Sequence, residues 1–194
     1  MENNSKITKF DRILESAIKI IGQKGFHSAK VKDIANDAGV ADGTIYNYFN
    51  NKEDILITIF RVKLEEYVKR ALLELSKDLS ADEKVKILVK YHIKVMTENP
   101  YLANVFQIEL RQPMKEIRVK VRKHLRDYFR LIEDVIEEGI KDKIFNPDLD
   151  IYLAREVFFG TLDEIVSTWV FKGFDRDLNE MADKVIPMLL KAFR

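Results

Sequence analysis

Residues 31–49 read VKDIANDAGVADGTIYNYF. Their apolar spacing predicts two helices of about two turns each, over about 31–38 and 42–48. Gly39 between them permits the left-handed turn that joins such helices. Helices this short need a third helix to pack against, and the apolar stripe of residues 10–21 supplies it. The predicted core of this three-helix, helix-turn-helix unit consists of Ile34, Ala35, Val40, Ile45 and Phe49.

The outward face of the second short helix is polar and aromatic. It consists of Asp42, Gly43, Thr44, Tyr46, Asn47 and Tyr48. Amide and hydroxyl groups on such a helix can read base edges in the major groove, and a glycine lets the backbone approach closely. Net charge gives only weak further evidence for DNA binding, because residues 1–52 carry eight Lys/Arg against six Asp/Glu and the whole chain carries +1. The pattern of this helix therefore predicts binding to double-stranded DNA.

The rest of the chain is predicted to be helical. It has no alternating apolar and polar run of the length that a strand needs. Helix starts are predicted at Asn51 with Asp54, at Ser80 with Glu83, at Asn99-Pro100, at Pro113 (a long helix to Val135), at Asn146-Pro147 and at Asp177 with Glu180. We expect an all-α protein of about nine helices. Residues 1–52 form the predicted DNA-binding domain, and residues 53–194 form a helical ligand-binding and dimerisation domain.

Residues 10–56 resemble the DNA-binding domain of the TetR family of transcriptional regulators. The matching motifs are Ile34-Ala35, Ala38-Gly39-Val40, Gly43-Thr44-Ile45-Tyr46-Asn47-Tyr48-Phe49 and Asn51-Lys52-Glu53-Asp54-Ile55-Leu56. The resemblance implies that Thr44, Tyr48 and Lys52 hold backbone phosphates, with Lys30 close to them. It implies that the residues facing bases are Asp42, Gly43, Tyr46 and Asn47.

Two positions depart from the usual pattern of that family. Ala29 and Ala41 stand where its members commonly have Thr or Ser as helix caps. An alanine has no side-chain oxygen, so it can neither cap a helix nor bind a phosphate. We therefore expect a capping or phosphate contact to be missing at each.

The last two predicted helices carry more apolar surface than one core needs. Over 150–172, ten apolar residues fall within an arc of about 160°, and three more lie outside it. The final helix adds Leu178, Met181, Val185, Met188, Leu189 and Phe193. A second copy of the chain would cover the excess in a two-fold four-helix interface, which predicts a homodimer. A thicker core is the alternative interpretation.

Two charged residues fall inside apolar sectors of their helices. Glu109 is surrounded by Leu102, Val105 and Ile108, and Arg155 lies in the middle of the apolar arc of 150–172. A charged group in such a place must be paired or must meet a ligand. Our hypothesis is that both are polar anchors in a mostly apolar interior, and an internal ion pair is an equally good interpretation.

Fragments in the second half look like the fatty-acid-degradation regulators within the TetR family. They are Glu109-Leu110-Arg111-Gln112, Phe159-Gly160-Thr161-Leu162-Asp163-Glu164 and Thr168-Trp169-Val170, with Ala41-Asp42-Gly43-Thr44 upstream. This resemblance implies a long-chain acyl-coenzyme A effector, whose phosphates could meet Arg111, Arg118 or Arg122. The residues expected to bind the effector are Phe106, Gln107, Leu110, Arg111, Arg155, Phe158, Phe159, Leu162 and Trp169. An aromatic stripe at helical spacing is also typical of a plain core.

Composition excludes several other functions. Cysteine is absent, and His27, His92 and His124 have no partner at metal-ligand spacing, so we expect no metal and no cofactor. No apolar run has the roughly 18 residues of a membrane helix, and no secretory signal is visible, so we expect a cytoplasmic protein. No carboxylate pair, Ser/His arrangement or Gly-rich phosphate loop indicates an enzyme.

The sequence therefore predicts a dimeric repressor that a small hydrophobic molecule, an acyl-coenzyme A on the resemblance, releases from its operator. The alternatives are a regulator of an efflux pump or another pathway that senses a different hydrophobic ligand, and a ligand-binding protein that does not bind DNA.

Overall fold

The computed structural model describes residues 8–75 and 78–194, and every regular element within them is an α-helix. The helices are α1 (Lys9–Lys24), α2 (Val31–Ala38), α3 (Asp42–Ile45), α4 (Lys52–Leu75), α5 (Ala81–Glu98), α6 (Pro100–Glu109), α7 (Lys115–Lys123), α8 (Arg126–Lys141), α9 (Ile151–Phe171) and α10 (Leu178–Phe193). The all-α prediction is confirmed, with ten helices in these residues where about nine were expected. None of the described helices is long and apolar enough to cross a bilayer.

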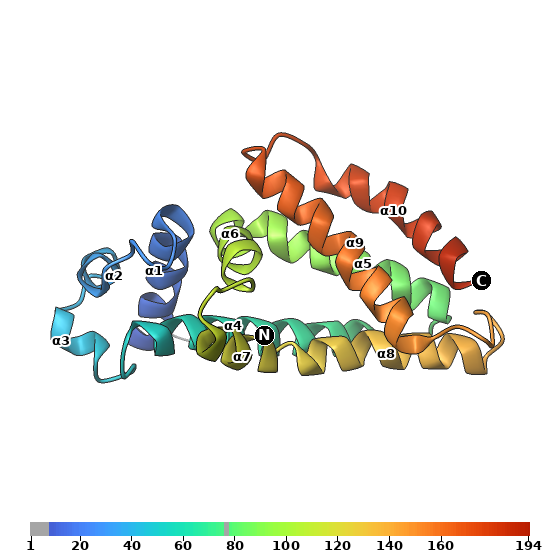
Figure 1. Cartoon of the computed structure of the whole chain (residues 1–194), viewed down its shortest axis with the longest axis horizontal. Coiled ribbons are helices and arrows are strands. Elements are labelled where there is room, and N and C mark those ends of the chain that lie inside the picture. The colour runs from blue at the N-terminus through green and yellow to red at the C-terminus, as the bar shows by residue number, and fades with distance from the viewer. Residues whose placement is uncertain (1–7, 76–77) are drawn as a thin grey trace, which may run out of the picture.

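The helices α1 to α3 form a small unit at one end of the molecule, and α4 extends from it along the larger remainder (Figure 1). Helix α4 packs against α1 on one side and against α5, α7 and α8 on the other, so it belongs to both parts. The predicted boundary at residues 52 and 53 coincides with the start of α4 and stays a prediction. Residues 1–7 of the first predicted domain lie outside the described residues.

The predicted core of the small unit is confirmed except at Val40, which is half-buried. Gly39 adopts a left-handed φ of 64°, which joins α2 to α3 as expected. Helix α3 itself ends at Ile45, three residues earlier than predicted. The chain then continues as a tighter turn, in which the backbone N–H of Asn47 and of Tyr48 donate to carbonyls three residues back, at 3.2 and 3.0 Å. We call residues 42–48 the recognition segment.

Side-chain caps place several helices where the sequence predicted them. The Ser80 hydroxyl accepts from the Glu83 N–H and Glu83 bonds back, the Asn99 side chain accepts from the Leu102 N–H at 3.0 Å, and Asn51 accepts from the Asp54 N–H at 2.8 Å. The predicted start at Asn146-Pro147 is wrong. Helix α9 begins four residues later, because Asp150 accepts from the Leu153 N–H at 2.9 Å, while Asn146 caps a tight turn by accepting from the Asp148 N–H.

The single long helix predicted from Pro113 is also wrong, because it is divided into α7 and α8 at residues 124 and 125. There the N–H groups of His124 and Leu125 donate to carbonyls three residues back, at 3.1 Å each, and the helix tightens. The apolar stripe of Ile117, Val121, Leu125, Tyr128, Ile132 and Val135 stays buried on both sides of the break. A local change of hydrogen bonding that leaves the stripe facing the core is invisible to sequence periodicity.

Neither α2 nor α3 has a side-chain cap. The N-cap of α2 is Lys30, while Ala29 is buried, and the N-cap of α3 is Ala41. The backbone of Ala41 already has the extended geometry of an N-cap, with φ −70° and ψ 148°. A hydroxyl at this position could therefore accept a hydrogen bond from the first turn of α3 without any backbone change.

We expect Ala41→Ser to raise the free energy of unfolding by about 1 kcal/mol, because it supplies the missing acceptor. Urea unfolding of the variant and of the unchanged chain measures the difference. Ala41→Val is the matched control, since it adds similar bulk but no acceptor. Equal stabilities of the Ser and Val variants would contradict the prediction.

Candidate DNA-binding surface and effector cavity

The recognition segment presents its polar face to solvent, as predicted. Asp42, Gly43 and Asn47 are exposed, and the side chains of Tyr46 and Tyr48 are 58% and 43% exposed. Thr44 is half-buried. Ile45 in the same segment is fully buried and anchors it to the core. The arrangement leaves hydrogen-bonding groups on a convex edge of the small unit, where a DNA groove could receive them.

The two lysines that the resemblance assigned to phosphates differ in the structure. Lys30 is exposed. Lys52 instead points inward: its ammonium donates to the carbonyl oxygens of Phe26 at 2.9 Å, His27 at 3.1 Å and Ala29 at 3.1 Å, and lies 4.6 Å from the centre of the Phe26 ring. Three acceptors use all three protons of an ammonium group. Lys52 therefore fixes the loop before α2 and has no proton left for a phosphate in this structure.

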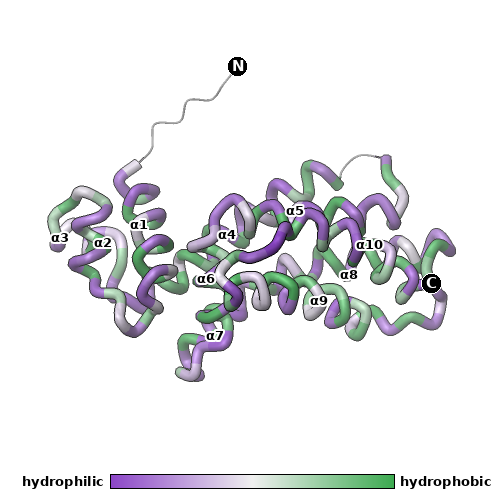
Figure 2. The backbone as a smooth tube through the Cα atoms, turned by 90° about the horizontal axis from the view of Figure 1, so that it is seen from above, coloured by the Kyte–Doolittle hydropathy of each residue, from purple (hydrophilic) through white to green (hydrophobic). Residues whose placement is uncertain are grey.

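Helices α9 and α10 leave large apolar side chains in solvent. Tyr152 and Phe171 are each 70% exposed, Met188 is 68% exposed, and Leu153 and Val157 are exposed beside them. These helices pack against each other, and hydrophobic positions follow one another along α9 in Figure 2. Several large apolar side chains left exposed on two neighbouring helices are typical of a protein–protein interface.

An apolar cavity lies inside the larger part of the molecule, between α4, α5, α6, α8 and α9. Its volume is about 30 Å³, which is the space of one water molecule. We call it the inner cavity. Its lining residues are Phe60, Leu64, Tyr67, His92, Met96, Phe106, Gln107, Leu110, Leu125, Tyr128, Phe159 and Asp163. Two of the aromatic rings that line it are stacked, since Phe60 of α4 lies on Phe106 of α6 with centroids 4.6 Å apart.

Four of the nine residues predicted to bind the effector line the inner cavity, namely Phe106, Gln107, Leu110 and Phe159. The other predicted residues lie elsewhere. Phe158, Leu162 and Trp169 are buried in the core. Periodicity identifies the apolar side of a helix, but that side is wider than the part of it that faces a cavity.

Both arginines that the sequence predicted to bind the effector form ion pairs with carboxylates in the structure. Arg111 pairs with Asp163 and also donates to the Gln107 carbonyl at 2.9 Å. Arg155 pairs with Glu133 at 3.2 Å and covers the ring of Phe129 at 4.8 Å. Arg155 thus forms an internal ion pair with Glu133, one of the two interpretations that the sequence left open, and neither arginine lines the inner cavity.

Sequence reasoning missed the part of the lining that comes from other helices. Phe60, Leu64 and Tyr67 come from α4, His92 and Met96 from α5, and Leu125 and Tyr128 from the α7–α8 region. The apolar and aromatic ones belong to helix stripes that are equally typical of a plain core. Two polar residues carried a local signal that could have marked the cavity, namely His92 on the buried face of α5 and Asp163 on α9, which was also missed.

The inner cavity contains few polar groups, and most of them are paired. The Ser167 hydroxyl donates to the Gln107 side-chain oxygen at 2.5 Å, and Nδ1 of His92 lies 3.1 Å from the Tyr128 hydroxyl. Nε2 of His92 is buried without a hydrogen-bond partner among the described residues. Burial lowers the pKa of His92 to about 4 and raises the pKa of Tyr67 and Tyr128. All three side chains are therefore neutral at pH 7, as an apolar site requires.

The burial of His92 in its neutral form predicts that the folded chain loses stability in mild acid. His92 titrates at about 4 in the folded chain and near 6.5 when unfolded, so the unfolded chain binds more protons between these values. Stability is fully present above pH 6.5 and falls as the pH drops toward 4. From about pH 7.5 to about pH 5, the unchanged chain should lose about 2 kcal/mol more than His92→Gln. Urea unfolding at both pH values measures this, and equal losses would contradict it.

Helix α6, which lines the inner cavity, also packs against α1 of the small unit. The buried Glu109 carboxylate accepts from the Phe26 N–H at 2.9 Å and from the Gln112 side-chain amide. The Asn104 amide donates to the Gly22 carbonyl at 2.6 Å. At Gly22 the two helices are so close that a Cβ atom would lie 2.7 Å from the Tyr101 carbonyl oxygen. Glu109 is thus an anchor, as predicted, but its partners are uncharged groups, one of them on the DNA-binding side.

Known proteins that resemble this chain have the same two parts, a DNA-binding unit and a larger C-terminal region. Residues 13–59 match the family described as bacterial regulatory proteins, tetR family, and residues 60–192 match the C-terminal region of YsiA-like proteins. The fatty acid metabolism regulator protein of Bacillus subtilis is 37% identical over 185 residues, covering 95% of each chain.

Solved structures show the same fold. The fatty acid degradation regulator FadR of Bacillus halodurans superposes with a TM-score of 0.92 at 41% identity, over 95% of this chain and 100% of that one. FadR of Bacillus subtilis in complex with stearoyl-CoA gives 0.91 at 36% identity, with the same coverage. These relatives are regulators and not enzymes, as the sequence predicted for this chain. The chain therefore belongs to the TetR family of bacterial regulatory proteins and is a DNA-binding transcriptional regulator.

Proposed function

We propose that this regulator is a repressor of fatty acid metabolism genes and that a long-chain acyl-coenzyme A releases it from its operator in the cytoplasm. The observation that carries the proposal is the inner cavity, a mostly apolar space lined by aromatic and aliphatic side chains, whose wall includes the helix that leads to the DNA-binding unit. The stearoyl-CoA bound to the Bacillus subtilis relative supports the same effector class.

The lining of the inner cavity suits a hydrocarbon chain. Aromatic and aliphatic side chains surround it, and its polar groups are largely paired with one another. A space of about 30 Å³ cannot hold a long acyl chain, because that is the volume of a single water molecule. The chain must therefore displace side chains, first of all the stacked pair of Phe60 and Phe106.

Displacing this pair moves α4. Phe60, Leu64 and Tyr67 line the cavity, and the same helix begins at Lys52, whose ammonium holds the loop before α2. A ligand that binds only the open cavity favours a conformation in which α4, and the recognition segment with it, has shifted. Coupling of about 1–3 kcal/mol weakens DNA binding about 5- to 150-fold for each coupled site.

The exposed apolar side chains of α9 and α10 support a two-fold dimer. In such a dimer, two recognition segments can enter successive major grooves of a partly palindromic operator, about 34–36 Å apart. A shift of α4 in each protomer changes this spacing. The effector therefore acts on DNA binding without touching the DNA-binding surface.

Fluorescence anisotropy with labelled DNA from upstream of the protein's own gene tests the proposal. We expect specific binding by a dimer and a loss of affinity when palmitoyl-CoA is added. Specific binding that other hydrophobic compounds relieve, but palmitoyl-CoA does not, would replace the effector with that of an efflux or other pathway. The absence of specific binding to any part of that DNA would contradict a repressor.

A further inference from the structure

Five side chains that line the inner cavity carry hydrogen-bonding groups. They are Tyr67, His92, Gln107, Tyr128 and Asp163. The Tyr67 hydroxyl donates to the Leu88 carbonyl at 3.4 Å, and the Asp163 carboxylate is paired with Arg111. The Tyr128 hydroxyl lies 3.1 Å from Nδ1 of His92. Two groups are left without a hydrogen-bond partner among the described residues, namely Nε2 of His92 and the side-chain nitrogen of Gln107.

His92 lacks one hydrogen bond whichever ring nitrogen carries its proton. The residue is 6% exposed, and burial lowers its pKa to about 4, so the ring is neutral at pH 7 and has one N–H donor and one acceptor nitrogen. If Nδ1 accepts from Tyr128, Nε2 is an unused donor. If Nδ1 donates to Tyr128, Nε2 is an unused acceptor.

The Gln107 amide is buried as well and has an unused end. Its oxygen accepts from the Ser167 hydroxyl at 2.5 Å, while its nitrogen carries two protons and donates to none of the described residues. Gln107 belongs to α6 and His92 to α5, so the unused groups come from two helices around one space of about 30 Å³. A space of that size holds one oxygen atom with its hydrogens, as in a water molecule or a hydroxyl group.

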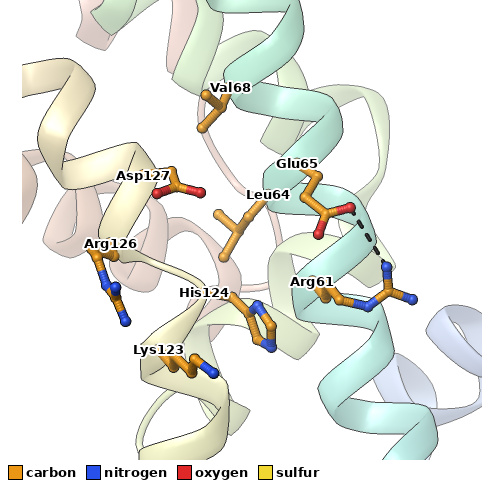
Figure 3. Close-up of a pocket in the computed structure, with 8 residues that line it drawn as sticks. All are labelled: Arg61, Leu64, Glu65, Val68, Lys123, His124, Arg126 and Asp127. Carbon is orange, nitrogen blue, oxygen red and sulfur yellow. Dashed lines mark ion pairs between the residues drawn. The ribbon is translucent and has the colours of Figure 1, made fainter.

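Charged groups in the neighbouring pocket are open to water instead. This pocket of about 190 Å³ lies between α4 and the α7–α8 region, and five exposed charged side chains line it (Figure 3). They are Arg61, Glu65, Lys123, Arg126 and Asp127. Water satisfies a charged group at the surface, whereas a buried donor or acceptor without a partner keeps its full desolvation penalty. The missing partner therefore belongs to the inner cavity and not to this pocket.

The kind of partner follows from the two unused groups. A methylene of a plain acyl chain neither donates nor accepts, so it leaves both side chains unsatisfied. A carbonyl oxygen only accepts, which suits Nε2 of His92 in one tautomer alone. A hydroxyl both donates and accepts, so it bonds Nε2 in either tautomer, and its oxygen can accept a second hydrogen bond from the Gln107 nitrogen.

We propose that the inner cavity receives a hydroxyl group on the hydrocarbon chain of the effector, with His92 as the residue that selects it and Gln107 as a second donor. The preferred effector is then a long-chain acyl-coenzyme A with one hydroxyl group, and a plain chain binds less tightly. The inference rests on the proposed function and narrows its ligand class. A site built to bond a hydroxyl discriminates against the analogue that lacks it, because its buried polar groups are then left unpaired.

Isothermal titration calorimetry on the full chain tests this with palmitoyl-CoA and a series of hydroxypalmitoyl-CoA isomers. The isomers carry the hydroxyl at carbon 3, 6, 9, 12 or 15, so that the group is tried along the whole chain. One isomer, or two neighbouring ones, should bind about 10-fold more tightly than palmitoyl-CoA. This comparison needs no variant, so it decides the inference even if a substitution in the cavity prevents folding.

His92→Phe keeps a ring of similar shape but removes both nitrogens. The preference for the best isomer over palmitoyl-CoA should fall below about 2-fold, while palmitoyl-CoA itself binds at least as tightly as before. Gln107→Met should reduce the preference about 3-fold, since it removes only the second donor. The control His27→Phe removes an exposed imidazole in the loop before α2 and should leave the preference unchanged.

The outcomes separate the inference from the proposed function. If the unchanged chain binds palmitoyl-CoA and no isomer binds more tightly, the inference is overturned and the proposed function stands. A preference that survives His92→Phe also overturns it, because the hydroxyl is then held elsewhere. Equal weakening of all the thioesters in His92→Phe overturns it too, since His92 would then only support the fold. If the unchanged chain binds none of them, the inference and the proposed function fail together.

Discussion

Asn47→Ala should abolish most specific binding to the operator while leaving the fold intact. The Asn47 side chain is exposed in the recognition segment, and its residue type reads adenine through two hydrogen bonds in the major groove. A bidentate contact contributes about 1–3 kcal/mol of discrimination, and a dimer loses two. We therefore expect operator affinity to fall roughly 30-fold to 10⁴-fold, measured by anisotropy at fixed salt.

The matched control is Asn179→Ala, which removes an exposed amide on α10, away from the recognition segment. It should leave operator affinity unchanged. Binding to unrelated DNA should also be similar in the unchanged chain and in Asn47→Ala, since that binding depends on phosphate contacts. A drop of less than about 3-fold in operator affinity would show that Asn47 does not read a base.

Glu109→Ala should cost about 3–6 kcal/mol of stability, because it leaves the Phe26 N–H and the Gln112 amide without their charged acceptor. Both groups lie in the contact between α6 and the small unit. The loss should therefore be accompanied by weaker docking of the DNA-binding unit on the larger part. Urea unfolding measures the first effect, and amide hydrogen exchange at residues 22–30 measures the second.

Glu109→Gln is the matched variant for this prediction. Its amide oxygen can still accept from the Phe26 N–H, and its amide nitrogen can donate to the Gln112 side-chain oxygen, which is buried without a partner among the described residues. We expect this variant to lose only about 1 kcal/mol. If both variants lose the same free energy, the hydrogen bonds to Glu109 are not what stabilises this contact.

The parts of the fold that depend on short-range signals could be predicted from the sequence. Ser80, Asn99, Asn51 and Asp177 each cap a helix within three residues of themselves, so their effect is visible in a short window. The exposed recognition segment followed from the same kind of pattern. The wrong start of α9 shows the limit, because Asn146 and Asp150 are both good capping residues, and the short-range pattern does not choose between them.

The inner cavity could be predicted only in part. Phe106, Gln107, Leu110 and Phe159 were found because they lie on apolar or mixed faces of two helices. Their neighbours from α4 and α5 could not be found, because a cavity between five helices depends on how those helices cross. Lys52 shows a second limit, since the family resemblance assigned its charge to DNA while the structure gives it three carbonyl partners.

The central claim is that an acyl chain in the inner cavity moves α4 and changes the spacing of the two recognition segments. Because the chain contains no cysteine, Asn36→Cys on the exposed side of α2 accepts a single spin label per protomer. Distance measurement by pulsed electron resonance should give one distribution for the dimer on its operator and a distribution shifted by several Å when palmitoyl-CoA is saturating. An unchanged distribution, with palmitoyl-CoA shown by calorimetry to be bound, would contradict the claim.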